Sequence, residues 1–154
     1  MYSNELICNI LSYIETNIKN KITIDNLVEE FNYNRYYIMK LFKKELGVSI
    51  VDYINIVRIY NSLDYIRRDY SFLSCALFSG FYSLEYYSEM FKKILGVNPR
   101  IYKRVINNKV VDENYLNEFT KNLASIKMII NRCNEYRANI SPTTLPIKKL
   151  SIFK

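Results

Sequence analysis

The sequence predicts an all-α protein in which two helix–turn–helix units are joined by a long linker helix and followed by an extra C-terminal helix. Three observations predict this fold class. The segment FKKELGV at 42–48 returns as FKKILGV at 91–97, so one motif occurs twice. Apolar residues recur at spacings of three and four, which is the period of a buried helix face. Only three Gly and three Pro interrupt the chain of 154 residues, and strand-like alternation is scarce.

The N-terminal segment predicts one amphipathic helix from about Asn4 to Asn20. Its apolar residues recur every three or four positions and therefore form a single buried stripe. The members of this stripe are Ile7, Ile10, Leu11, Ile14 and Ile18.

The first helix–turn–helix unit follows. Thr23 or Asp25 is the expected N-cap of its first helix, because either side chain accepts hydrogen bonds from free backbone N–H groups. Asn32 occupies the turn, since Asn tolerates the left-handed backbone conformation. Asn34 caps a second helix over about 35–46, which Gly47 ends. The residues expected to point inward are Ile24, Leu27, Val28 and Phe31 on the first helix, and Tyr37 or Ile38, Leu41 and Phe42 on the second.

A longer helix over about 50–69 joins the two units. The second unit begins near Ser71 and turns at Gly80-Phe81. Ser83 caps its second helix, over about 84–95, and Gly96 ends that helix. The inward residues are Ile54, Val57, Leu63 and Ile66 on the linker helix, and Phe72, Cys75, Ala76 and Ser79 on the helix after it.

The chain after the second unit divides at about residue 104. Pro99 is accepted at the first position of a short helix that ends in Lys103 and Arg104. Residues 1–104 are therefore expected to form the double helix–turn–helix domain, and residues 105–154 a helical extension and tail. Arg137 is expected to break the apolar seam of this extension, and Pro142 to end its helix. The seam comprises Leu116, Phe119, Leu123, Ile126, Ile130 and Cys133; the last dozen residues are a tail, an edge strand or a docked segment.

Composition favours an anionic partner and disfavours several kinds of site. The net charge is +7, from 22 Lys and Arg against 15 Asp and Glu, which suits nucleic acid and equally a mildly basic protein without such a partner. Cys8, Cys75 and Cys133 are scattered, so free thiols in a reducing cytoplasm are expected. The absence of His excludes His-based catalysis and Cys/His zinc sites. Neither a cofactor, an enzyme activity, a signal peptide nor a membrane span is predicted.

The repeated motif resembles the DNA-binding part of AraC/XylS-type bacterial transcription regulators over roughly residues 5–104. Residues 39–48 resemble the end of the first helix–turn–helix of that family. The second unit resembles the family at Ala76, Gly80-Phe81, Ser83, Phe91-Lys92, Gly96-Val97, Pro99 and Tyr102. The family's pattern there is Ala, then Gly-Phe, Phe-Lys, Gly-Val-x-Pro and Tyr, and this sequence reproduces its spacing. Arg58 falls where the linker helix of the family usually carries Arg. Val28 stands where the family usually has Ala, and Asn32 where Gly is common.

The resemblance implies that each recognition helix enters the major groove of duplex DNA, with the linker helix holding the two about one helical turn apart. Small members of the MarA/SoxS branch are similar in having no domain before the DNA-binding part, and they act as monomers on asymmetric sites. Larger members carry a ligand-binding domain in front of the DNA-binding part, and this chain of 154 residues is expected to have no room for one.

The first recognition helix is the better candidate reader of bases. Lys40 can donate to guanine O6 and N7, and Tyr36 and Met39 can pack against a thymine methyl group. Lys43 and its counterpart Lys92 are expected at phosphates, which give affinity without sequence information. The complete set of candidates on this helix is Asn34, Arg35, Tyr36, Met39, Lys40, Lys43 and Lys44.

The second recognition helix departs from the family. By position its groove-facing residues are Leu84, Glu85, Ser88 and Glu89, with Ser83 as cap and Lys92 near the backbone. Carboxylates accept a hydrogen bond from cytosine but repel phosphate. The second unit therefore binds DNA weakly, reads a step that contains cytosine, or binds something else.

Two functional hypotheses stay open from the sequence. The first is a sequence-specific regulator that binds duplex DNA through both units. The alternative is a protein-interaction module or anti-regulator with weak or no DNA binding. The C-terminal seam has three interpretations, which are packing on the protein's own body, self-association as a homodimer, and docking to RNA polymerase or another regulator. The short seam slightly favours a monomer.

Overall fold

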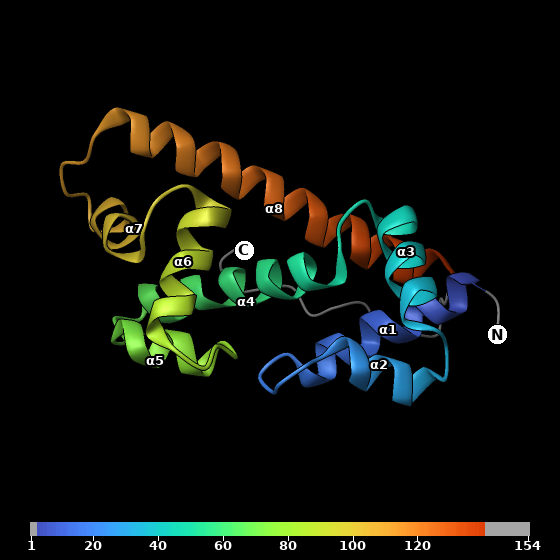
Figure 1. The fold of residues 1–154 in the computed structure, drawn as a ribbon. Helices are drawn as coiled ribbons and strands as arrows, with labels where there is room; N and C mark the ends of the chain where they lie inside the picture. The colour runs from blue at the N-terminus through green and yellow to red at the C-terminus, as the bar shows by residue number, and fades with distance from the viewer. Residues whose placement is uncertain (1–2, 141–154) are drawn as a thin grey trace.

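The computed structural model describes residues 3–140, which form eight helices and, within this range, no strand (Figure 1). The helices are α1 (Ser3–Asn17), α2 (Ile24–Phe31), α3 (Arg35–Leu46), α4 (Ile50–Arg67), α5 (Phe72–Phe78), α6 (Leu84–Leu95), α7 (Pro99–Ile106) and α8 (Glu113–Ile140). The predicted all-α class is confirmed. The expectations for the last dozen residues and for Pro142 lie outside the described residues. No helix in the described range is long and apolar enough to cross a bilayer.

The helix starts follow local capping chemistry. Of the two candidate caps for α2, Thr23 takes the position, since its hydroxyl accepts from the Asn26 backbone N–H at 3.1 Å. The Asn26 side-chain oxygen in turn accepts from the Thr23 backbone N–H at 3.0 Å. Asn32 adopts the left-handed conformation expected of the first turn, with φ 57°. Pro99 occupies the first turn of α7 as predicted.

Three helix ends differ from the prediction. α1 stops at Asn17 rather than Asn20, because the next carbonyl groups bond to another helix. Arg58 of α4 donates to the carbonyl oxygens of Ile18 and Asn20 at 2.9 and 2.6 Å. α4 ends two residues earlier than expected, and α7 continues two residues past Arg104.

The core is organised around α4. This helix contacts α3, α5, α6, α7 and α8, and most of its residues are buried. The α2–α3 unit lies at one end of α4 and the α5–α6 unit at the other (Figure 1). Burial of Arg58 lowers the pKa of its guanidinium, and the two carbonyl oxygens compensate part of the lost hydration. The predicted apolar stripe of α1 packs into the same core, with Ile18 at its edge.

The long helix α8 covers the body on one side (Figure 1) and contacts α1, α4, α6 and α7. Near its start, Phe119 packs against Tyr102 of α7, with ring centroids 5.2 Å apart. Near its end, the guanidinium of Arg137 donates to the Glu15 carboxylate at 2.7 Å. The prediction that Arg137 breaks the seam is wrong. Arg137 is buried and continues the seam, because Glu15 of α1 supplies the opposite charge.

Candidate nucleic-acid interface

The candidate interface begins with α3. Its N-cap Asn34 accepts hydrogen bonds from the backbone N–H groups of Tyr36 and Tyr37, at 2.8 and 3.4 Å. One face of α3 is anchored in the core by Ile38, Phe42 and Leu46, which are all buried. The opposite face is exposed. It presents Arg35, Tyr36, Met39, Lys40, Lys43 and Lys44 to solvent.

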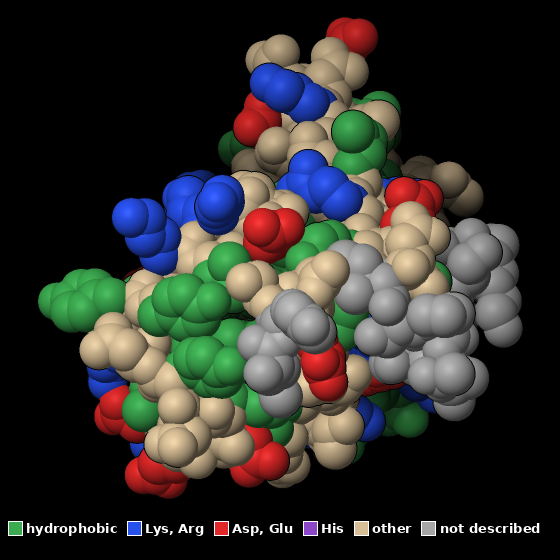
Figure 2. Space-filling view, turned by 90° about the vertical axis from the view of Figure 1, so that its right-hand side faces the viewer, with side chains coloured by type: hydrophobic (Ala, Val, Ile, Leu, Met, Phe, Trp, Pro, Cys, Tyr) green, Lys and Arg blue, Asp and Glu red, His purple; other side chains and the backbone are tan. Residues whose placement is uncertain are grey.

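The exposed face of α3 is basic and partly aromatic. Tyr36 is 80% exposed, a large fraction for an aromatic side chain. Arg35 forms an ion pair with Asp25 of α2, so part of its charge is compensated within the unit. The three lysines add positive charge beside Tyr36 and Met39. Figure 2 looks at the end of the molecule that carries α1–α3, where several basic side chains gather next to projecting hydrophobic ones.

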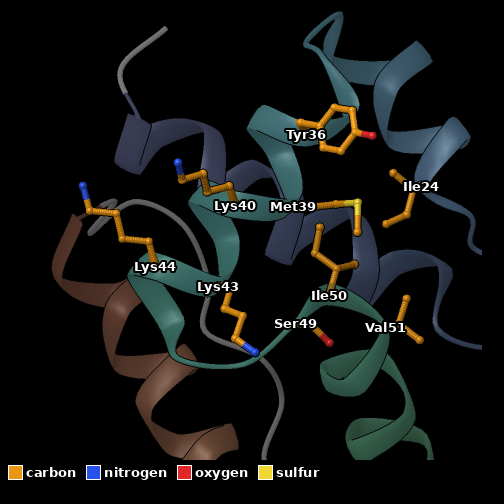
Figure 3. A pocket seen from close by; sticks show the side chains of 9 residues that line it. All are labelled: Ile24, Tyr36, Met39, Lys40, Lys43, Lys44, Ser49, Ile50 and Val51. Atoms are coloured by element: carbon orange, nitrogen blue, oxygen red, sulfur yellow. The ribbon is translucent and has the colours of Figure 1, made fainter.

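A groove of about 530 Å³ lies between α3 and the first turn of α4 (Figure 3). Met39 points across it toward Ile24, with Ile50 and Val51 below, and these side chains make its floor apolar. Lysines border the groove, and the Lys43 side chain extends toward the Ser49 side (Figure 3). The lining residues are Ile24, Tyr36, Met39, Lys40, Lys43, Lys44, Ser49, Ile50 and Val51.

Sequence reasoning missed the contribution of α4 to this groove. Val51 is half exposed although it is apolar, and Ser49 caps α4 by accepting from the Asp52 N–H at 3.1 Å. The available signal was an apolar residue at an outward position in the first turn of the linker helix. Only the packing of α4 against α3 places it beside Met39.

The second candidate reader, α6, is built in the same way as α3. Ser83 accepts from the Tyr86 backbone N–H at 3.1 Å, and Gly96 ends the helix in the left-handed conformation. Tyr87, Phe91 and Leu95 anchor it in the core. Figure 1 places α3 and α6 on opposite sides of the middle of α4.

The outer face of α6 has a different chemistry. Glu85, Glu89 and Lys92 are exposed, whereas Ser88 is half-buried. Leu84 is also half-buried and packs against the core, so it presents less surface than its position in the sequence suggested. The predicted residues of α6 therefore form a mainly acidic strip with one lysine at its C-terminal end.

Two tyrosines near α6 were not predicted. Tyr82 lies in the turn before the helix and is 66% exposed. Tyr86 is partly exposed, and its hydroxyl accepts from the Asn55 side chain of α4 at 3.1 Å. This bond ties the outer side of α6 to the linker helix. Tyr82 stands one residue before an N-cap, as does Tyr33 in the first unit, and this repetition was the missed signal.

The thiols take no part in the exposed surface. Burial raises the pKa of Cys75 to about 11 and that of Cys133 to about 12. Cys8 is buried as well, and among the described residues none of the three cysteines is in a disulfide. Buried, protonated thiols of this kind pack as small apolar groups.

The repeated units match a known family model. A family described as a helix-turn-helix domain, of AraC type, matches residues 27–104, which is just over half of the chain and includes α3 and α6. This chain belongs to the AraC-type helix-turn-helix family. The resemblance predicted from the motifs is confirmed. The family match supports DNA-binding transcription regulation.

Known relatives of this chain are regulators. The transcriptional regulatory protein HptR from Staphylococcus aureus is 32% identical over 101 residues, covering 66% of this chain and 40% of HptR. An uncharacterized response regulatory protein from Staphylococcus epidermidis is 31% identical over 103 residues, covering 67% of this chain and 41% of that protein. The matched part thus spans about two fifths of these relatives.

Two solved structures share the fold. A protein of unknown function from Listeria innocua superposes with a TM-score of 0.59 at 28% identity, covering 63% of this chain and 93% of that one. The C-terminal domain of AraT, a response regulator from Geobacillus stearothermophilus, gives a TM-score of 0.62 at 23% identity, covering 70% and 88%. The second likeness bears on the fold alone.

Proposed function

We propose that this protein is a sequence-specific transcription regulator that binds duplex DNA with α3 and α6 in successive major-groove segments. One observation carries the proposal. Two helices of the same length, with matching caps and matching buried anchors, both pack on α4, α3 near its N-terminal end and α6 along its middle. Such a pair fits two turns of one face of the duplex when the linker sets the separation.

The first unit supplies most of the base recognition in this proposal. Lys40 donates to guanine O6 and N7, and Tyr36 and Met39 contact a thymine methyl group. The apolar floor beside Met39, which includes Ile24 and Val51, extends the surface for such a methyl group. Lys43 and Lys44 bind phosphates and set affinity and register. Asn34 places the N-terminus of α3, with its free N–H groups, toward a phosphate.

The second unit contributes less affinity. Glu85 and Glu89 are exposed where α3 presents Tyr36 and Lys40, so they repel phosphates unless a cytosine N4 amino group lies opposite. Ser83, Leu84 and Ser88 supply shape and weak polar contacts. Lys92 binds the backbone, as Lys43 does in the first unit.

The test is binding of the full chain to genomic fragments, followed over a salt series. A regulator that contacts phosphates gives a steep negative slope of log affinity against log salt. Footprinting is then expected to show strong protection of one major-groove segment and weaker protection about one turn away. Flat and negligible binding at low salt would overturn the proposal.

A protein-interaction module or anti-regulator is the second candidate function. The acidic outer face of α6 favours it, because that face is unsuited to a polyanion. In this case α6 docks on a basic surface of another regulator or of RNA polymerase, and removing Glu85 and Glu89 abolishes that contact while leaving the low DNA affinity unchanged. We propose a monomer in either case, since most of the apolar seam of α8 packs on the protein's own body, although Leu116, predicted to belong to the seam, is 40% exposed.

A further inference from the structure

The outer face of α5 differs sharply from that of its counterpart α2. Aligned on their turn residues Asn32 and Gly80, the two helices place unlike side chains at equal outward positions. In α2 these are the exposed carboxylates Asp25, Glu29 and Glu30. In α5 they are Leu73, Leu77 and Phe78, which are 51%, 49% and 47% exposed.

The exposed apolar surface continues beyond α5. Phe78 packs against the rings of Tyr65 and Tyr70, with centroids 5.6 and 5.7 Å away. Tyr70 is itself 40% exposed. Tyr70, Leu73, Leu77 and Phe78 are called the α5 patch below. A contiguous exposed apolar surface of this kind is a candidate interaction site.

Positive charge borders the α5 patch. The Arg68 guanidinium lies 5.2 and 5.5 Å from the ring centroids of Tyr65 and Tyr70. Arg67 and Arg68 both pair with the carboxylate of Asp64, so two guanidinium groups and one carboxylate stand at this edge. Lys19 adds positive charge beside Tyr65, since it donates to the Tyr65 hydroxyl at 3.3 Å, whereas Lys103 is paired with Asp69 at 2.6 Å.

We propose that the α5 patch binds an amphipathic helix of another protein that carries apolar side chains on one face and carboxylates along its border. Leucine and phenylalanine side chains anchor such a helix, and the arginines select acidic residues at the rim. The same charge argument disfavours two other occupants. A second copy brings an equally basic border, and the segment 141–154 of this chain contains three lysines and no acidic residue. This inference does not rest on the proposed DNA contacts.

The test uses the full chain and a synthetic helical peptide of about 18 residues with a leucine face and glutamates at its border. Its partner probe has lysine in place of every glutamate. The acidic peptide is expected to bind with an affinity that falls with salt, and the basic peptide is not. The double variant Leu77→Gln/Phe78→Gln removes apolar surface without adding charge and is expected to weaken binding about tenfold or more. Arg68→Gln is expected to weaken it less.

The matched control is Glu29→Gln/Glu30→Gln, which places the same side chains at the equal positions of α2. It is expected to leave peptide binding unchanged. Because Phe78 also packs on Tyr65 and Tyr70, the α5 variant is expected to melt at a somewhat lower temperature, and binding is compared well below that temperature. Equal binding of both peptides, or binding that the α5 variant does not weaken, would overturn the proposal. A mass that is dimeric in the native chain and halved in the α5 variant would assign the patch to a second copy. Loss of DNA affinity in that variant would assign it to DNA.

Discussion

The two helix–turn–helix units have the same interior and different exteriors. Phe42 and Phe91 are both fully buried, and Gly47 and Gly96 end their helices with φ of 75° and 81°. Outside, α3 carries four basic residues and one acidic residue, whereas α6 carries two of each. The difference extends to the helices that precede them, since α2 exposes carboxylates where α5 exposes apolar groups.

This contrast separates what a unit needs to fold from what it needs to act. Caps and buried anchors are fixed by the geometry of the motif, so they recur. Outward positions make no such demand, and their chemistry reports the partner of each unit. Under the proposals made above, the first unit binds a polyanion, and the second makes a weaker DNA contact and offers a protein-binding surface.

The largest expected effect comes from disrupting the packing of α8 on the body of the protein. Leu123 of α8 is half-buried against the core. Leu123→Asp is expected to lower the free energy of unfolding by about 3 kcal/mol, because apolar burial is lost and a carboxylate is partly desolvated. Sedimentation is expected to show a monomer before and after. A halved mass would instead identify a dimer interface, and unchanged melting with unchanged mass would identify a docking surface for another protein.

The next effect concerns base reading by the first unit. Lys40→Ala is expected to weaken binding to the preferred site by about 1–3 kcal/mol and to flatten preference at one base pair. Lys43→Ala is the matched control, since it is expected to weaken all sequences equally and to lower the salt slope by about one. Selection of sites from a random DNA pool measures both. Normal binding of Lys40→Ala to every sequence would show that α3 is oriented differently.

A smaller effect compares the two helix ends. Alanine at either glycine meets left-handed strain of about 1–2 kcal/mol. At Gly96 a Cβ would also stand 2.4 Å from Cγ of Glu118, whereas at Gly47 it would stand 3.3 Å from the flexible end of Arg132. Gly96→Ala is therefore expected to destabilise the protein more than Gly47→Ala in chemical denaturation. Equal losses of unfolding free energy in the two variants would mean that Glu118 of α8 moves away from residue 96 as readily as Arg132 moves away from residue 47.

The smallest effect tests the acidic face of the second unit. Glu89→Gln is expected to raise non-specific DNA affinity about two- to threefold at low salt, because one repulsion from the phosphates is removed. Glu135→Gln removes the same charge from an exposed position of α8 and serves as the control. Unchanged affinity for Glu89→Gln would indicate that α6 does not approach DNA.

Much of the fold was predictable because its determinants are local. The caps Asn34 and Ser83 act on N–H groups two or three residues away, and the left-handed turn at Asn32 depends on one residue. The apolar spacing of α1 and α3 fixed their buried faces for the same reason. The outward side chains of α3 followed from this spacing, so the candidate residues of the first unit are exposed as expected.

The arrangement of distant segments was decided by tertiary packing. The sequence by itself determined the helices, their caps and the repetition of the unit. It did not determine that Arg137 is buried, because its partner Glu15 lies 122 residues away. The groove beside Met39 likewise needs Val51 of α4, and the half-burial of Leu84 needs neighbours from other helices. Capping hydrogen bonds join residues two or three positions apart, so they can be predicted from the sequence alone. Burial depends on which surfaces meet, and only the folded chain brings those surfaces together.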